Sequence, residues 1–192
     1  MHEGVRAGIA AFDAGEYAAA RDVWRDANEP GERLADAASM IVRGRAGSFD
    51  RVAADARAAS ETLSEFDVKR GVGVAALRDY LDTVAADPEV IARRRPPAIA
   101  LDGEPVALDD LDVGGVLTLA PAVAAAAGGD RARVEQAVEY ARSDLDGEAN
   151  AFVALCYDVV TDPEARPVAY QRLVERVERR EAREADVEGL FG

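Results

Sequence analysis

Charged and aromatic side chains gather near the start of the chain, at spacings that two paired helices would bring together. The candidates for ligand binding are Asp13, Tyr17, Arg21, Trp24 and Arg43. Guanidinium groups beside an aromatic wall can hold a carboxylate or a phosphate through charge-assisted hydrogen bonds. One hypothesis is therefore a recess between the N-terminal helices that binds a small anionic ligand or a segment of a partner protein.

The same stretch also has a purely structural interpretation, in which its charged residues form a half-buried network that fixes the register of the helices. The residues of this network would be Arg21, Asp22, Arg43 and Arg45. We favour this interpretation because packing alone accounts for the aromatic spacing. It predicts that Arg21 pairs with a carboxylate while Asp22 lies nearer the rim. The candidate partners of Arg21 are Asp13, Glu16 and Glu32.

A hydrolase-type enzyme is the alternative function. Its acid–base groups would be the carboxylates of Asp13, Glu16 and Asp22, and Arg21 or Arg43 would stabilise negative charge. Such carboxylates must lie together in one concave site with perturbed pKa values. The sequence assigns no catalytic residue, so we prefer a helical scaffold or interaction protein over an enzyme.

Histidine and cysteine chemistry has little support in this chain, which holds one histidine and one cysteine. His2 lies at an end that we expect to fray. Cys156 lies in the apolar run 151–157, where a small core residue is expected. A single cysteine excludes an intrachain disulfide and a cysteine metal cluster. We therefore expect no metal and no cofactor.

Two predicted helices over 3–14 and 16–27, separated by Gly15, position the candidate residues. Small residues and aromatics recur here at the spacing of a tetratricopeptide-type helix pair, where small residues allow close approach and aromatics fill the seam. They are Gly8, Phe12, Gly15, Tyr17, Ala20, Trp24 and Ala27. We expect Trp24 to be buried against Phe12 or Tyr17.

The rest of the chain also shows helical periodicity. Further helices are predicted over 31–46, 49–63, 68–86, 112–127, 130–146, 148–161 and 165–185. One short β-hairpin is expected over 99–106, because an Asp-Gly pair between apolar residues is a strong hairpin signal. The predicted fold class is all-α, with antiparallel helix pairs that form a helical bundle.

The prolines at 96 and 97 interrupt this periodicity, because a proline removes a backbone donor and restricts the residue before it. We therefore divide the chain into an N-terminal helical core (1–88), a linker with the short hairpin (89–111) and a C-terminal helical part (112–192) packed on the first. The arginine run 93–95 could dock an acidic partner, but a solvated linker is the preferred interpretation.

The chain is strongly acidic, with 37 acidic against 23 basic residues, a net charge of −14 and Lys69 as its one lysine. This composition is typical of proteins from a salt-rich cytoplasm, and it lacks the basic face that nonspecific nucleic-acid binding needs. We find no signal-peptide pattern and no run of about 18 apolar residues. We therefore expect a cytoplasmic protein without nucleic-acid or membrane partners. An oligomer is compatible with the sequence.

The acidity predicts that the fold is more stable in molar KCl than in dilute buffer. Carboxylates repel one another at low ionic strength, and molar salt shortens the Debye length to about 3 Å. Thermal melting curves across a KCl series test this expectation. A midpoint that stays flat or falls as KCl rises would argue against adaptation to salt.

The opening stretch resembles the domain of unknown function 309 family, whose signature reads F-N-x-G-x-Y-x-x-A-H-E-x-W-E. The residues that match at identical spacing are Phe12, Gly15, Tyr17, Ala20 and Trp24. The motif resemblance covers roughly residues 4–66, and the remainder resembles longer members from salt-loving archaea. The resemblance implies an all-helical bundle and supplies no established activity.

This chain departs from the family signature at its polar positions. Asp13 replaces the Asn, Arg21 the His, Asp22 the first Glu and Arg25 the last Glu, and Arg43 stands where a second His would be. Arginine neither ligates metal nor acts as a base at neutral pH. A metal-dependent or histidine-catalysed function is therefore disfavoured for this chain.

Overall fold

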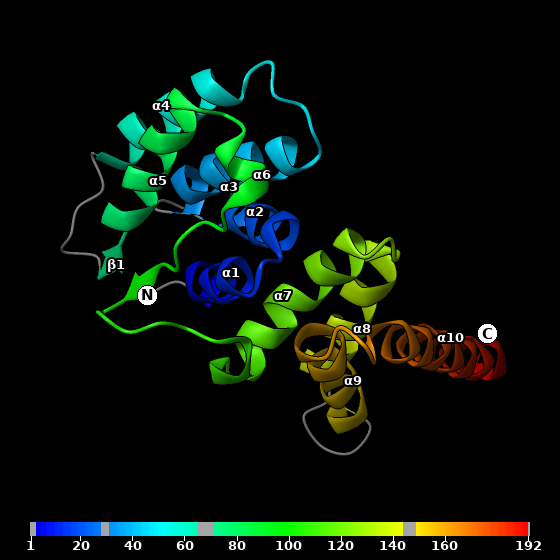
Figure 1. Cartoon of the computed structure of the whole chain (residues 1–192). Coiled ribbons are helices and arrows are strands. Elements are labelled where there is room, and N and C mark those ends of the chain that lie inside the picture. Colours follow the sequence, from blue (N-terminus) through cyan, green and yellow to red (C-terminus); the bar gives the residue numbers. More distant parts are fainter. Residues whose placement is uncertain (1–2, 28–30, 65–70, 144–148, 192) are drawn as a thin grey trace. The chain divides into compact units, whose positions relative to one another are not determined.

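The computed structural model describes residues 3–27, 31–64, 71–143 and 149–191, and these form an all-α protein with one very small sheet (Figure 1). The predicted fold class is thus confirmed. The chain divides into two compact units, Met1–Leu119 and Ala120–Gly192. The division falls inside helix α7 (Val113–Ala126). Residues 89–111, which the sequence suggests as a linker, lie within the first unit.

The first unit is a series of helices in which each packs on the next along the chain. The main helices are α1 (Glu3–Ala14), α2 (Tyr17–Asp26), α3 (Gly31–Arg45), α4 (Val52–Ser64) and α5 (Ala75–Ala86). Two short helices follow, α6 (Val90–Arg93) and the 3₁₀ turn η2 (Leu108–Asp110). Helix α6 contacts α3 and α5, and η2 contacts α1.

Gly15 ends α1 and turns the chain directly into α2. Its φ of +93° is the left-handed conformation that favours glycine. The amide of Gly15 donates to the carbonyl of Phe12 at 2.9 Å, and the amide of Glu16 donates to that of Ala11 at 2.8 Å. These bonds satisfy two carbonyls at the end of α1, as a glycine C-cap does.

Trp24 is the centre of the α1–α2 seam and has no exposed surface. Its ring lies 5.6 Å from the ring of Phe12, and its Nε1 donates a hydrogen bond of 3.3 Å to the carbonyl of Val5. Gly8 lies directly beneath the indole, where a Cβ would overlap the ring. Phe12 also contacts Tyr17 edge-to-face at 5.1 Å. The prediction that Trp24 is buried against Phe12 is confirmed.

The tight turn predicted at Asp102-Gly103 is present. Both residues have positive φ, 53° and 89°, as a two-residue hairpin turn requires. The amide of Leu101 donates to the carbonyl of Glu104 at 2.7 Å, and the reverse bond measures 3.0 Å. Strand β2 (Ala100–Leu101) lies directly before this turn. It pairs antiparallel with β1 (Val72–Gly73).

The sequence predicts a helix over 68–86, but α5 begins at Ala75, so the prediction is wrong for residues 71–74, which the structure describes. Gly71 has a φ of +75°, and its carbonyl accepts a hydrogen bond of 2.6 Å from the amide of Asp102. The side chain of Asp102 fills the space where a Cβ of Gly71 would lie. Pairing with a distant strand therefore overrides the local helical periodicity.

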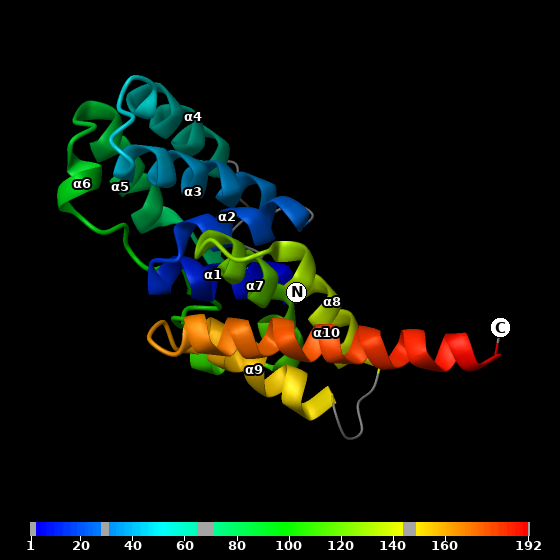
Figure 2. The same ribbon diagram turned by 90° about the vertical axis from the view of Figure 1, so that its right-hand side faces the viewer.

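The second unit contains α8 (Arg131–Ser143), α9 (Ala149–Thr161) and α10 (Arg166–Phe191), which pack on one another. Figure 2 shows α10 running past the ends of α8 and α9. Charged contacts line α8 and α10: Arg133 pairs with Glu181 at 2.9 Å, and the Tyr140 hydroxyl donates to Glu184 at 2.9 Å. Helix α10 ends at Phe191, beyond residue 185, where the sequence prediction ends it.

Cys156 is a buried core residue of α9, as predicted. Burial raises the pKa of its thiol to about 12, so the reactive thiolate is scarce at neutral pH. None of the helices in the described ranges combines the length and the apolar composition that crossing a membrane requires.

Candidate functional site

Three of the five residues predicted to bind a ligand are engaged away from the α1–α2 turn. Trp24 belongs to the core and has no exposed surface. Arg43, in the last turn of α3, pairs with Asp55 of α4 at 2.7 Å. Arg21 pairs with its neighbour Asp22 at 2.7 Å. Asp13 and Tyr17 are therefore the two predicted residues that lie at this turn.

The predicted surroundings of Arg21 are wrong in two respects. Its carboxylate partner is the adjacent Asp22, whereas the sequence suggested a residue from α1, the α1–α2 turn or the start of α3. The two side chains are also similarly exposed, 26% for Arg21 and 23% for Asp22, so Asp22 does not lie nearer the rim. Flexible side chains allow two adjacent residues to meet although their Cβ atoms point about 100° apart.

Asp13, in the last turn of α1, holds the segment that follows α6. Its Oδ1 accepts a hydrogen bond of 3.0 Å from the amide of Ile99. Its Oδ2 is buried and has no partner among the described residues. Burial raises the pKa of the carboxyl to about 6, although the Ile99 amide and the positive charge of Arg95 act in the opposite direction. Asp13 is thus a half-buried acid that titrates close to neutral pH.

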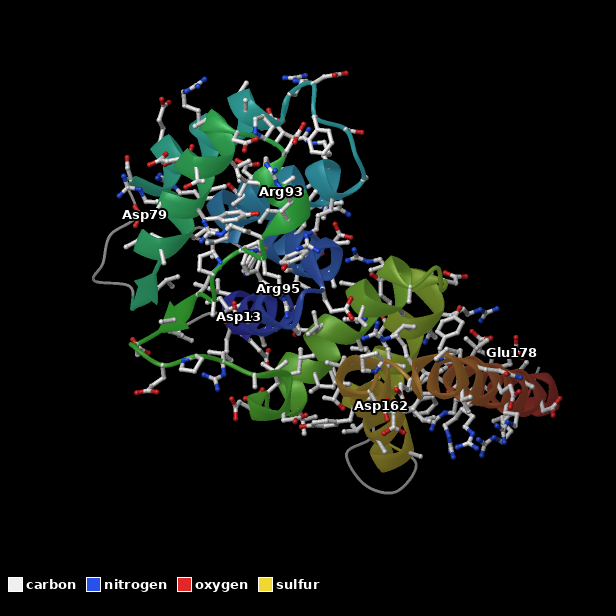
Figure 3. The ribbon with its side chains drawn as sticks, viewed as in Figure 1. Asp13, Asp79, Arg93, Arg95, Asp162 and Glu178 are labelled. Carbon is white, nitrogen blue, oxygen red and sulfur yellow. The ribbon has the colours of Figure 1, made fainter. Side chains whose placement is uncertain are left out.

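Arg95 lies against the turn between α1 and α2 and beside Asp13 (Figure 3). Its Nη2 donates to the backbone carbonyl of Asp13 at 3.3 Å. The same nitrogen would lie 2.9 Å from a Cβ placed on Gly15. The glycine therefore serves both the left-handed turn and the close approach of this guanidinium group.

Two tyrosines support two further arginines at the same end of the first unit. The guanidinium carbon of Arg45 lies 5.0 Å above the ring of Tyr17, a cation–π contact. The hydroxyl of Tyr80, on α5, donates to the backbone carbonyl of Arg94 at 3.3 Å. Burial raises the pKa of the Tyr80 hydroxyl, and the nearby charges of Arg45 and Arg94 lower it. Both guanidinium groups therefore lie near one hydroxyl.

We call Arg45, Arg94 and Arg95 the arginine cluster. All three are exposed, and none forms an ion pair with a carboxylate within the described ranges. Their neighbours differ: Arg43 pairs with Asp55, and Arg93 pairs with Asp87 at 2.9 Å. The cluster is thus an exposed group of three positive charges, of which Arg95 lies beside the Asp13 carboxyl.

The sequence interpretation missed Tyr80, Arg94 and Arg95 as site residues. The helical spacing predicts that Tyr80 is a buried residue of a helix, and the arginine run 93–95 is interpreted as a solvated linker. The signal that could have been used is the proline pair after the run, since Pro96 and Pro97 force an extended segment. That segment can lie across a neighbouring helix, but its place on α1 is a long-range contact that no local pattern contains.

No three histidine, cysteine, aspartate or glutamate side chains lie close enough to hold a metal ion in the part of the chain that the structure describes. The groups beside the α1–α2 turn include guanidinium groups, tyrosine hydroxyls and the Asp13 carboxyl, whose pKa is raised.

Comparisons with protein-family models, with curated proteins and with solved structures give no match to this chain. The relationship to the domain of unknown function 309 family therefore stays a prediction from the matching motif residues.

Proposed function

We propose that this protein is a helical scaffold or interaction protein whose first unit binds an anionic group at the arginine cluster. The anion belongs to a small ligand or to an acidic segment of a partner. The observation that supports this proposal is the set of three exposed arginines that form no ion pair with a carboxylate among the described residues, in a chain of net charge −14. Acidic side chains outnumber basic ones in this chain, so three neighbouring guanidinium groups with only the Asp13 carboxyl beside them are unexpected on composition alone.

The support given to these side chains strengthens the proposal. Tyr17 lies beneath Arg45, and the backbone of the α1–α2 turn holds Arg95. Ordering a long side chain during binding costs about 0.5–1.5 kcal/mol, so side chains that are already held bind an anion at a lower cost. Arginine also presents a planar fork of donors that matches carboxylate and phosphate oxygens.

The proposed site shares Asp13 and Tyr17 with the site predicted from the sequence, but it contains different arginines. Arg21 and Arg43 are paired with Asp22 and Asp55, which reduces their positive charge toward an incoming anion. The arginine cluster takes their place, at the turn between α1 and α2.

Anion-dependent thermal stabilisation tests the proposal. Citrate and a short poly-glutamate peptide should raise the melting temperature of the wild-type protein in moderate KCl. The triple variant Arg45→Gln, Arg94→Gln and Arg95→Gln should keep its helical circular dichroism and lose the anion effect. The matched control is Arg43→Gln, because Arg43 lies two residues before Arg45 on the same helix and is already paired with Asp55.

The control should respond to anions as the wild-type protein does, because Arg43 faces Asp55 and lies outside the arginine cluster. An equal anion response in the wild-type protein and the triple variant would refute the proposed site. So would a wild-type protein that no anion stabilises.

An enzyme that uses Asp13 as its acid–base group is the second candidate. The specific observation is the buried Oδ2 of Asp13, without a partner among the described residues, on a carboxyl whose pKa is raised to about 6. A general acid or base works best with a pKa near the operating pH. A turnover that Asp13→Asn abolishes, with anion binding retained, would favour the enzyme over the scaffold.

A further inference from the structure

We infer that the arginine cluster recognises a phosphoryl group, presented as free phosphate or as a small phosphate monoester. This inference rests on the proposed function and adds the chemical class of the ligand. Three features support it: the charge of the cluster, the separate segments that supply its donors and the burial of the supporting rings.

The local charge matches a dianion better than a single carboxylate. The cluster brings three guanidinium groups to this end of the first unit, and the Asp13 carboxyl lies beside one of them, Arg95. Glu16, in the same turn, is engaged in a contact of its own. A phosphate monoester carries about −1.5 to −2 near neutral pH, so it offsets more of the positive charge of three guanidinium groups than one carboxylate does.

The donors come from separate segments of the first unit. Arg45 ends α3, Arg94 and Arg95 follow α6, and Tyr17 begins α2. Among the described residues no hydrogen bond of the Tyr17 hydroxyl is present, and this hydroxyl is not among the buried atoms that lack a partner, so it can donate to a ligand. Donors held on separate segments can reach different oxygens of a tetrahedral group with three terminal oxygens, while a carboxylate offers two oxygens in one plane.

The aromatic rings at this site support the arginines and leave no face for a second ring. Tyr17 is 6% exposed and Tyr80 is 5% exposed. Arg45 already covers the ring of Tyr17. Stacking on a nucleobase requires an open aromatic face, so the site selects the phosphoryl group itself rather than a nucleotide.

Isothermal titration with inorganic phosphate and with glycerol phosphate tests the inference, at about pH 8 where the phosphoryl group is fully ionised. Both probes should bind the wild-type protein, and acetate at the same concentration should not. Tyr17→Phe keeps the ring beneath Arg45 and removes the hydroxyl, and it should weaken phosphate binding about fivefold to tenfold at an unchanged melting temperature. The triple arginine variant should show no binding, and Arg43→Gln should match the wild-type protein.

The two probes separate the possible sources of the phosphoryl group. Glycerol phosphate that binds at least as tightly as inorganic phosphate indicates a monoester ligand, and much weaker binding indicates free phosphate. Binding of citrate or poly-glutamate without any binding of phosphate would overturn this inference and leave the proposed function standing. Phosphate binding that survives in the triple variant would overturn the inference, and the absence of binding by every anion would overturn both.

Discussion

Gly8→Ala is expected to lower the free energy of unfolding by about 2–3 kcal/mol. An added Cβ at Gly8 would overlap the indole of Trp24, which is buried and cannot move outward without displacing Phe12. Moving the indole also breaks the hydrogen bond of 3.3 Å from its Nε1 to the carbonyl of Val5. These losses exceed the gain of about 0.5–1 kcal/mol that alanine brings to a helix interior.

Gly4→Ala provides the matched control, because Gly4 and Gly8 occupy one helix four residues apart. A Cβ at Gly4 would lie 3.4 Å from the Cβ of Ala27 and 3.7 Å from Val23, which are acceptable contacts. The control should therefore be neutral or slightly more stable. Urea denaturation followed by tryptophan fluorescence measures both variants. A Gly8→Ala protein as stable as the Gly4→Ala protein would show that the seam tolerates an extra methyl group.

The α1–α2 seam could be predicted because its information is local. Gly8, Phe12, Gly15 and Trp24 lie within a short stretch, and their spacing alone specifies two helices with a tight turn between them. The Asp102-Gly103 turn was predictable for the same reason, since two adjacent residues that tolerate positive φ suffice to close it.

The contacts that build the candidate site are not local. Asp13 accepts a hydrogen bond from the amide of Ile99, 86 residues further along the chain. Strand β2 likewise pairs with β1, which lies in a stretch of helical periodicity. Hydrophobic periodicity reports which face of a segment is buried, but it does not report which distant segment covers that face.

Arg43 and Arg45 show why the sequence does not tell which arginine of α3 lies beside Tyr17. Two residues that are two positions apart on a helix point about 200° apart. One of them must therefore face α4 and the other the opposite side, but the sequence does not say which. In the structure Arg43 meets Asp55 of α4, and Arg45 covers Tyr17 of α2.

The wild-type protein is expected to lose stability at Asp13 as the pH rises from about 4 to about 7, and the Asp13→Asn variant should not show this loss. The pKa of Asp13 is raised from 3.8 to about 6 in the folded protein. The neutral carboxyl therefore stabilises the fold, fully below pH 3.8, and this contribution is lost as the pH rises through 6. For a fully buried group, this pKa shift would change the free energy of unfolding by about 3 kcal/mol. Asp13 is only half-buried, so solvent screening reduces the expected change to about 1–2 kcal/mol.

Asparagine is a suitable neutral replacement because its Oδ1 can still accept the hydrogen bond from the amide of Ile99. The variant should match the wild-type protein at about pH 4 and be more stable by about 1–2 kcal/mol at about pH 7.5. Urea denaturation at constant KCl, in buffers without phosphate, gives the difference between the two proteins at each pH. Taking this difference removes the contribution of all other carboxylates.

Asp22→Asn is the control for the pH series, since Asp22 is a surface carboxylate whose partner is the adjacent Arg21. It should not gain stability over the wild-type protein as the pH rises. Equal stability of the Asp13→Asn and wild-type proteins at every pH would mean that Arg95 compensates the ionised carboxylate in full. The pairing of Asp13 with Arg95 would then be a closed structural contact, and the excess charge available to an anion would come from Arg45 and Arg94 alone.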